Sequence, residues 1–431
     1  MADVTPFRGI RYDRAVALDD VVAPPYDVIS ATHGDALRAR SPYNVVRLDM
    51  PVAPGETPAE EAYTRSASLF RQWQADGVLG RDETPSMYLV DQTYVGPDGR
   101  ERTRRGFVAR LRLSGFSEGI VRPHERTHSG PRMDRLRLYR AAHADLSQIF
   151  LLVADDDGAV SEALAGGAAA EEAREARDGD GNLHRIAPLG GGAAVRIVAA
   201  LRKQPVYIAD GHHRYETALA YRDERRAAGD HSADTLMVYI CSLSDPGLTV
   251  FPTHRLLKGV AVPPLDVLLE RLRPFFEPVA EPVRGAHAAR ALLDRLPEQA
   301  DPGRVFGLYL AAQDMCLVVR AREPQVTRHL LAAGLSAETA ALSVTVLHDL
   351  ILRDVLGIDP GAEEERVEYV KNVTDALAAL AAGGYDAGAF LNATEVAQVR
   401  AVADRGEVMP QKSTYFYPKL LTGLVLDELG E

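Results

Sequence analysis

Two strand-like runs of apolar residues lie in the first third of the chain, over residues 86–94 and 106–113. They flank the turn Gly96-Pro97-Asp98-Gly99, which is typical of a hairpin connection. Residues 58–76 follow a helix-like pattern. The N-terminal part therefore predicts a helix together with an antiparallel sheet.

The clearest pattern lies in the middle of the chain. It predicts, in order, a helix over 194–203, a strand over 206–208, a helix that ends near 228 and a strand over 235–243. In the second helix, Tyr215, Ala218 and Leu219 share one apolar face, as an amphipathic surface helix requires. A polar motif separates the first strand from this helix.

The flanking regions are less regular. Residues 158–192 are rich in glycine, alanine and charge, and predict a short helix plus a hairpin around the turn Asp178-Gly179-Asp180-Gly181. From about residue 261 the pattern predicts helices over 264–276, 284–296 and 337–356 and a hairpin around 313–314.

Composition limits the classes of protein to consider. At 431 residues, the chain predicts two or three packed units rather than one continuous core. The formal net charge of -12 argues against a nucleic-acid binder that relies on a broad basic surface. Cys241 and Cys316 lie in apolar stretches and suit a reducing compartment. Neither a signal peptide nor a membrane span is supported, so we expect a cytoplasmic protein, with homo-oligomerisation left open.

The polar motif is Asp210-Gly211-His212-His213-Arg214. A strand that turns directly into a helix places free backbone N–H groups and the positive end of the helix dipole at one point, which favours an anion. Gly211 allows close approach of the backbone, and Arg214 can make a two-pronged contact with phosphate. His212 and His213 add hydrogen-bond donors. Asp210 suits a metal ligand or a group that orients a histidine; the alternative interpretation makes it an ordinary helix cap.

A second polar cluster covers residues 122–132. Its segment His124-Glu125-Arg126-Thr127-His128 matches the spacing of zinc-binding H-E-x-x-H helices. A glycine and a proline would end such a helix within two turns, and no clear third ligand follows, so we disfavour a zinc protease. We interpret the loop as phosphate-facing, with His124 and Arg126 as donors and Glu125 as the base for a substrate hydroxyl. A solvated charged loop is the alternative.

Two further polar groups interrupt apolar surroundings. His254 and Arg255 follow a predicted buried strand, and Lys412 precedes an apolar C-terminal segment. We assign these three residues to phosphate binding, because sites are usually built on loops beside rigid elements. Alternatively, Ser413 or Thr414 caps a terminal helix.

If these clusters share one ligand, residues 122–132, 210–214, 254–255 and Lys412 should converge on a single positive cleft. His348 lies on a predicted helix among apolar neighbours, and we interpret it as a core histidine rather than a ligand.

Five blocks together resemble a widespread prokaryotic family known as a conserved domain of unknown function. The blocks are residues 23–29 (APPYDVI), 122–132, 207–218 (YIADGHHRYETA), 252–255 (PTHR) and 409–414 (MPQKST). They span almost the whole chain in the same order, which makes the resemblance specific.

The turn from Asp210 to Arg214 also resembles the phosphate-binding turn of ADP-dependent free-serine kinases, which share a fold with the ParB nucleotide-binding domain and sulfiredoxin. The resemblance implies that Asp210, Gly211, His212, His213 and Arg214 contact nucleotide phosphate. It also implies a separate glutamate that assists the serine hydroxyl. No position aligns with that glutamate by motif, and Glu125 is assigned to the role on chemical grounds. The catalytic cysteine of sulfiredoxin has no counterpart in this turn.

We therefore expect an α+β fold with a ParB/sulfiredoxin-like core and an additional C-terminal α/β region. The expected divisions are an N-terminal α+β region (1–157), a central phosphate-binding region (158–260) that completes the ParB/sulfiredoxin-like unit, and the C-terminal region (261–431).

The expected activity is transfer of a phosphoryl group from ADP or ATP to serine or a similar hydroxylated metabolite. Glu125, Asp210 and His213 are the expected catalytic residues, and Mg²⁺ bridges the phosphates with Asp210 as its protein ligand. Two alternatives use the same residues. One is a metal-dependent phosphoester or nucleotide hydrolase with His124 and His128 as ligands, and the other is a non-catalytic nucleotide-binding switch of the ParB type.

Overall fold

The computed structural model describes residues 1–125, 130–166, 172–279, 281–299, 304–358 and 363–430. The chain divides into two compact units. Unit 1 comprises Met1–Pro123, Thr127–Thr249 and Phe416–Glu431, and unit 2 comprises His124–Arg126 and Val250–Tyr415. Across the described ranges, every helix is too short or too polar to cross a membrane.

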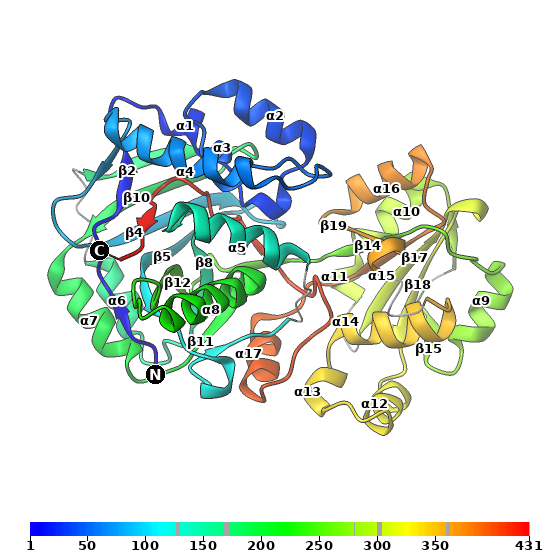
Figure 1. The fold of residues 1–431 in the computed structure, drawn as a ribbon. Helices are drawn as coiled ribbons and strands as arrows, with labels where there is room; N and C mark the ends of the chain where they lie inside the picture. The colour runs from blue at the N-terminus through cyan, green and yellow to red at the C-terminus, as the bar shows by residue number, and fades with distance from the viewer. Residues whose placement is uncertain (126–129, 167–171, 280, 300–303, 359–362, 431) are drawn as a thin grey trace. The chain divides into compact units, whose positions relative to one another are not determined.

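Unit 1 is built on a mixed sheet of nine strands among the described residues (Figure 1). In spatial order the strands are β6 (Val121–Arg122), β11 (Val206–Asp210), β8 (Ile149–Val153), β12 (Thr235–Ser242), β5 (Glu101–Arg112), β4 (Met87–Val95), β10 (Leu183–Leu189) and β9 (Arg174–Arg177), with β1 (Val4–Thr5) paired to β5. Strands β6 and β11 run parallel, as do β8 and β12, and the other pairs are antiparallel. The predicted mixture of helix and sheet is confirmed.

Helices surround this sheet. Those of unit 1 are α1 (Leu18–Val21), α2 (Ala31–Arg40), α3 (Val46–Asp49), α4 (Glu60–Ala75), α5 (Gly130–Ala142), α6 (Ala159–Ala165), α7 (Gly191–Leu201) and α8 (His212–Ala227). The apolar faces of α6, α7 and α8 pack on one face of the sheet, where Ile197 and Tyr215 are fully buried. Helix α4 and the hairpin β4–β5 match the elements expected from the N-terminal pattern.

Unit 2 contains an antiparallel sheet of seven strands in the part of the chain that is described. Its strands are β15 (Phe276–Pro278), β18 (Met315–Ala321), β17 (Val305–Leu310), β20 (Ala387–Leu391), β14 (His254–Leu257) and β19 (Val367–Val370) in order, with β16 (Val283–Arg284) paired to β18. Its helices are α9 (Leu265–Leu272), α10 (Ala286–Leu293), α11 (Leu296–Gln299), α12 (Glu323–Ala332), α13 (Ala337–Ala340), α14 (Ser343–Val346), α15 (Glu363–Arg366), α16 (Val373–Ala382) and α17 (Val396–Asp404). The predicted hairpin around residues 313–314 joins β17 to β18.

The prediction of a single helix over residues 337–356 is wrong. The structure breaks it into α13, α14 and a π-helix, η5 (Leu347–Val355), with Leu342 in an extended conformation. Arg304 Nη1 donates to the carbonyl oxygen of Ala340 at 2.5 Å, which satisfies this carbonyl from outside the helix. A long-range side chain of this kind cannot be read from the periodicity of residues 337–356.

The C-terminal segment also differs from expectation, because residues 416–431 belong to unit 1. Ser413 and Thr414 precede a short strand, β21 (Tyr415–Tyr417), so the alternative in which they cap a terminal helix is wrong. Strand β22 (Asp427–Glu428) pairs with β7 (Ala144–Asp145). The segment is held by backbone pairing and buried side chains that no local pattern predicts.

The pairing of β22 with β7 brings two buried carboxyl groups together, Asp145 and Asp427. Asp145 accepts hydrogen bonds from the Tyr139 hydroxyl at 2.6 Å and from the Met237 backbone N–H at 2.7 Å. Burial, followed by the charge of Asp427, raises the pKa of Asp145 to about 7. Asp427 itself is ion-paired with Arg110 at 2.7 Å.

We expect the free energy of unfolding to fall as pH rises from about 4 to about 7. Between these values the folded protein keeps a proton on Asp145 that the unfolded chain, with a pKa near 3.9, has already released. The variant Asp145→Asn should lose stability at every pH but show a shallower decline. Urea unfolding measured across this range checks the slope, with the exposed Asp76→Asn as the control that keeps the wild-type slope. An unchanged slope in Asp145→Asn would contradict the assignment.

Candidate functional site

The predicted anion-binding turn lies where β11 ends and α8 begins. Gly211 has φ of +97°, a left-handed conformation that favours glycine, and it is the residue before the first helical position. A β-carbon at this position would lie 3.1 Å from Arg214 Nη2, so a larger residue would also displace the arginine. Gly211, which has no side chain, occupies the N-cap position of α8, so Asp210 lies one residue before the cap. The backbone N–H groups of the first helical turn and the positive end of the helix dipole lie at this point.

Two cations flank the Asp210 carboxylate. Arg214 Nη2 lies 3.7 Å from Asp210 Oδ2, and Lys419 Nζ lies 3.3 Å from Asp210 Oδ1. Arg214 is buried, and its Nη1 donates to the carbonyl oxygen of Gln148 at 2.8 Å. Burial by itself would lower the pKa of Arg214, but the charge of Asp210 and weaker contributions from neighbouring acidic groups raise it. The guanidinium is thus fixed in a charged state beside the turn.

Lys419 reaches this position because a buried arginine holds the backbone of the C-terminal segment. Arg104 donates from Nη1 to the carbonyl oxygen of Tyr417 at 3.2 Å and from Nη2 to that of Pro418 at 2.6 Å. Gln92 Nε2 donates to the carbonyl oxygen of Lys419 at 3.0 Å. The carbonyl oxygens of three successive residues therefore accept hydrogen bonds from side chains of β4 and β5. These hydrogen bonds fix the backbone position of Lys419.

The N-terminal segment contributes to the same cluster. Tyr26 lies under the guanidinium of Arg135, whose carbon is 4.0 Å from the ring centroid, in a cation–π arrangement. Arg135 also pairs with the buried Asp49 at 3.1 Å. Burial raises the pKa of Asp49, and the charges of Arg135 and Arg214 oppose that rise. Asp27, next to Tyr26, is exposed to solvent, and its charge acts on Arg214.

Helix α5 carries Arg135 and packs beside α8 in unit 1 (Figure 1). Between them lies a cavity of about 20 Å³ that is lined by Asp49, Arg135, Tyr139, Ser147 and Arg214, among others. This volume holds about one water molecule. A phosphate ligand would therefore bind outside this cavity, on the solvent side of the turn.

Unit 2 brings together several other predicted residues. His124 Nε2 lies 3.0 Å from the Thr414 hydroxyl, and Glu125 Oε1 accepts from the Lys412 backbone N–H at 3.0 Å. The backbone N–H of Met409 donates to the carbonyl oxygen of His124 at 2.7 Å. The segment around His124 is therefore paired with the segment around Lys412, as the sequence analysis expected for these two blocks. Arg126 and His128 lie outside the described residues.

Arg255 and His348 form a second buried contact in unit 2. Arg255 Nη2 donates to His348 Nε2 at 3.1 Å and to the carbonyl oxygen of Lys412 at 3.4 Å. Because arginine can only donate, His348 Nε2 must be the acceptor, so this imidazole is neutral. Burial and the charge of Arg255 lower the pKa of His254 to about 3, so His254 is also neutral near pH 7.

His348 was expected to be a core histidine. It is buried, but it also contacts a candidate site residue and lies in the π-helix η5. π-helical turns are rare and occur frequently at functional sites. The described residues contain no group of three or more histidine, cysteine or acidic side chains placed to hold a metal ion.

The structure thus arranges the predicted residues as one cluster in each unit. In unit 1, Asp210 to Arg214 lie with five residues that the sequence analysis did not assign to a site, namely Tyr26, Asp27, Asp49, Arg135 and Lys419. Two of these, Tyr26 and Asp27, lie in the block 23–29, which the sequence analysis had included in the resemblance to the family. In unit 2, His124, Glu125, Arg255 and Lys412 lie together. The expectation of a single cleft for all the blocks stays a prediction.

The fold and the turn define a mixed α/β protein in which two cations, Arg214 and Lys419, lie beside Asp210 at the start of a helix. Residues 4–345 match the model of a family described as "Protein of unknown function (DUF1015)", and the chain belongs to this family. A search of curated proteins found no match.

Among solved structures, the chain is similar to a free serine kinase in complex with AMP, with 15% identity, 72% of this chain and 89% of that chain covered, and a TM-score of 0.36. It is also similar to a conserved hypothetical protein from Pyrococcus furiosus, with 14% identity, coverage of 70% and 89%, and a TM-score of 0.33. A third similar structure is SbnI with a C-terminal truncation from Staphylococcus aureus, with 10% identity, coverage of 70% and 82%, and a TM-score of 0.35.

Proposed function

We propose that this protein is a phosphotransferase that moves a phosphoryl group from ADP or ATP to serine or a similar small hydroxylated metabolite. The observation that carries the proposal is the cluster at the N-terminus of α8, where Arg214 and Lys419 lie on either side of Asp210. We further propose that unit 1 contains a ParB/sulfiredoxin-like core and that the protein acts in the cytoplasm.

Phosphate binding is assigned to the turn itself. The backbone N–H groups at the start of α8 and the helix dipole attract an anion, and Gly211 lets the ligand approach the backbone closely. His212 and His213 are assigned as further donors, and His213 is assigned to contact the transferred group. Arg214 and Lys419 neutralise charge that is spread over the phosphate oxygens, which is most of what phosphoryl transfer requires from a protein.

Magnesium is the proposed cofactor, and Asp210 is its proposed protein ligand. A single carboxylate fits this ion, because Mg²⁺ in nucleotide sites is usually held by one or two carboxylates together with the phosphates of the substrate. When bound, the ion would neutralise charge on the phosphates. Arg214 and Lys419 keep the Asp210 carboxylate oriented towards the turn.

Two carboxylates are candidates for the base that takes the proton from the acceptor hydroxyl. The acceptor oxygen bonds to the terminal phosphorus as the bond to the bridging oxygen breaks, and AMP or ADP leaves. We assign the role to Asp27, because it is exposed and lies in the same unit as the turn, within electrostatic reach of Arg214. Glu125, the candidate from the sequence, is retained as the second assignment. Its Oε1 accepts a hydrogen bond from the Lys412 backbone N–H at 3.0 Å.

The residues of unit 2 are proposed to bind phosphate groups of the nucleotide or of a phosphorylated product. His124, His254, Arg255 and Lys412 are assigned to this role, together with Arg126 outside the described residues. The neutral state of His254 limits it to a hydrogen bond rather than an ion pair with the ligand.

The test of the reaction is direct. The protein is incubated with Mg²⁺, either ADP or ATP, and a pool of small hydroxylated metabolites, and phosphorylated products are sought by mass spectrometry. Tight nucleotide binding without any product would favour the alternative of a ParB-type switch. Release of inorganic phosphate together with stoichiometric zinc would favour the hydrolase.

Replacing Arg214 by alanine should weaken nucleotide binding by about 1.5–3 kcal/mol, the usual scale for a charge-assisted hydrogen bond. Calorimetric titration with nucleotide measures this change. Arg226→Ala is the control, because Arg226 lies in the last turn of the same helix and pairs with Asp234. Since Arg214 is buried, thermal unfolding of each variant must show that the fold is retained. If a folded Arg214→Ala protein bound nucleotide with unchanged affinity, the turn would be an ordinary helix start without a role in nucleotide binding.

A further inference from the structure

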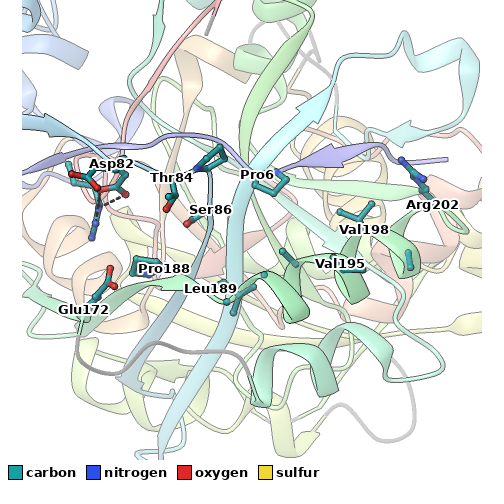
Figure 2. Close-up of a pocket in the computed structure, with 17 residues that line it drawn as sticks. Pro6, Asp82, Thr84, Ser86, Glu172, Pro188, Leu189, Val195, Val198 and Arg202 are labelled. Carbon is teal, nitrogen blue, oxygen red and sulfur yellow. Dashed lines mark hydrogen bonds and ion pairs between the residues drawn. The ribbon is translucent and has the colours of Figure 1, made fainter.

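A large cavity in unit 1 lies apart from the residues assigned to phosphate transfer. Its volume is about 930 Å³, which is in the range of pockets that bind small organic molecules. Helix α7 forms one wall, and the segment 82–86 and the end of β10 form much of the rest. Figure 2 shows Val195 and Val198 along the helix, with Pro188 and Leu189 continuing the apolar surface.

Helix α7 is apolar on two faces. One face buries Ala193, Ile197 and Leu201 against the sheet. Val195, which is 70% exposed, and Val198, which also packs against the core, line the cavity. Exposed apolar surface of this kind is unfavourable in water by about 25 cal/mol for each Å² and is typical of a surface that binds a partner or ligand. An apolar ligand that covers this wall would therefore be stabilised by removing its surface from water.

The two ends of the cavity differ in charge. Figure 2 places Asp82 and Glu172 at one end and Arg202 at the opposite end. Asp82 is already neutralised by Arg11 at 2.7 Å, but no described residue forms an ion pair or hydrogen bond with the side chain of Glu83 or Glu172. Among the described residues, Glu83 and Glu172 therefore line the cavity as carboxylates without an ion-pair partner.

The same end is rich in oxygen atoms that accept hydrogen bonds. Figure 2 shows the hydroxyl groups of Thr84 and Ser86 turned to the cavity near Asp82. An ammonium group has three donors and no acceptor, so carboxylate and hydroxyl oxygens match it, whereas a carboxylate or phosphate would be repelled. The negative charge of the whole chain also attracts cations to the surface.

We propose that this cavity binds a small organic amine with an apolar body. The ammonium group lies among Glu83, Glu172 and the neighbouring hydroxyls, and the apolar body covers Val195 and Val198 on α7. Arg202, whose nearest carboxylate is Asp3 at 3.9 Å, lies at the far end and disfavours a second cation there. This site does not depend on the proposed phosphotransferase activity, because none of its lining residues belongs to the cluster around Asp210.

Calorimetric titration of the full chain with octylamine, octanol and octanoate tests the proposal, since the three probes share a chain length and differ in charge. Octylamine should bind at one saturable site, and octanol and octanoate at least about tenfold more weakly. The double variant Glu83→Gln with Glu172→Gln should weaken octylamine binding about fivefold to tenfold and leave octanol unchanged. Glu175→Gln, an exposed carboxylate outside the cavity, is the matched control and should bind like the wild type.

A second variant tests the apolar wall. Ala199→Trp should fill part of the cavity and weaken both octylamine and octanol, with circular dichroism confirming that the fold is retained. Equal affinity for the three probes, preference for octanoate, or unchanged octylamine binding in the double variant would overturn the proposal. The proposal would also be overturned if the protein forms a concentration-dependent dimer that Val195→Arg dissociates and that octylamine does not affect. In that case the apolar wall would bind a second copy of the chain.

Discussion

Replacing Asp27 by asparagine should lower turnover in the proposed phosphoryl transfer on the order of 100-fold or more, while nucleotide affinity stays nearly unchanged. The reason is that Asp27 is assigned to the acceptor hydroxyl, and a base that acts on the acceptor contributes little to binding of the donor. Asparagine keeps the size of the side chain and removes its charge and basicity. Product formation, measured by mass spectrometry, and calorimetric titration with nucleotide give the two quantities.

Glu125→Gln is the matched variant for this test, since it makes the same chemical change at the other candidate carboxylate. The assignment to Asp27 expects Glu125→Gln to retain most of the turnover. A large loss of turnover in Glu125→Gln with Asp27→Asn unaffected would return the role to the residue chosen from the sequence. Full activity in both variants would remove a carboxylate base from the mechanism.

The variant Arg104→Ala should lower the free energy of unfolding by about 3–5 kcal/mol. Arg104 is fully buried and hydrogen-bonds to Gln92 and to the carbonyl oxygens of Tyr417 and Pro418. Its guanidinium also lies 4.5 Å from the centroid of the Phe150 ring. Truncation would leave buried acceptors without donors and would open a cavity under the ring.

Urea unfolding followed by the fluorescence of Trp73 measures this loss, because Trp73 is the one tryptophan of the sequence and is buried in α4 of unit 1. Arg100→Ala is the control and should change stability by less than about 0.5 kcal/mol, because Arg100 is 84% exposed in the β4–β5 turn. A loss below about 1 kcal/mol in Arg104→Ala would contradict the role of Arg104 in holding the C-terminal segment.

Several elements could be predicted because their causes are local. The hairpin β4–β5 follows from two apolar runs around a Gly-Pro-Asp-Gly turn, and its strands pair as expected. The strand–turn–helix unit β11–α8 follows from an apolar strand, a glycine and an amphipathic helix in direct succession. The candidate anion site at Gly211 was predicted from the same succession, since the free N–H groups at a helix start are a property of the backbone.

Other features were missed because they depend on residues distant in the chain. Lys419 lies beside Asp210 only because Arg104 and Gln92 hold the preceding backbone. The break in the helix expected over 337–356 coincides with a contact from Arg304. His348 follows a helical pattern that predicts a core position, and its contact with Arg255 is visible only when β14 and η5 are packed together.

The sequence by itself determined several local elements, the strand–turn–helix unit that carries the candidate anion site, and the family, because periodicity, turn residues and ordered blocks depend on residues that are close in the chain. Only the tertiary structure decided which side chains join that turn. Asp27, Arg135 and Lys419 are separated from Asp210 by long stretches of chain, and their meeting depends on the packing of α5 against α8 and on the return of the C-terminal segment to unit 1. The same packing places acidic groups, Asp210 first among them, close enough to the buried Arg214 to raise its pKa against the opposing effect of burial.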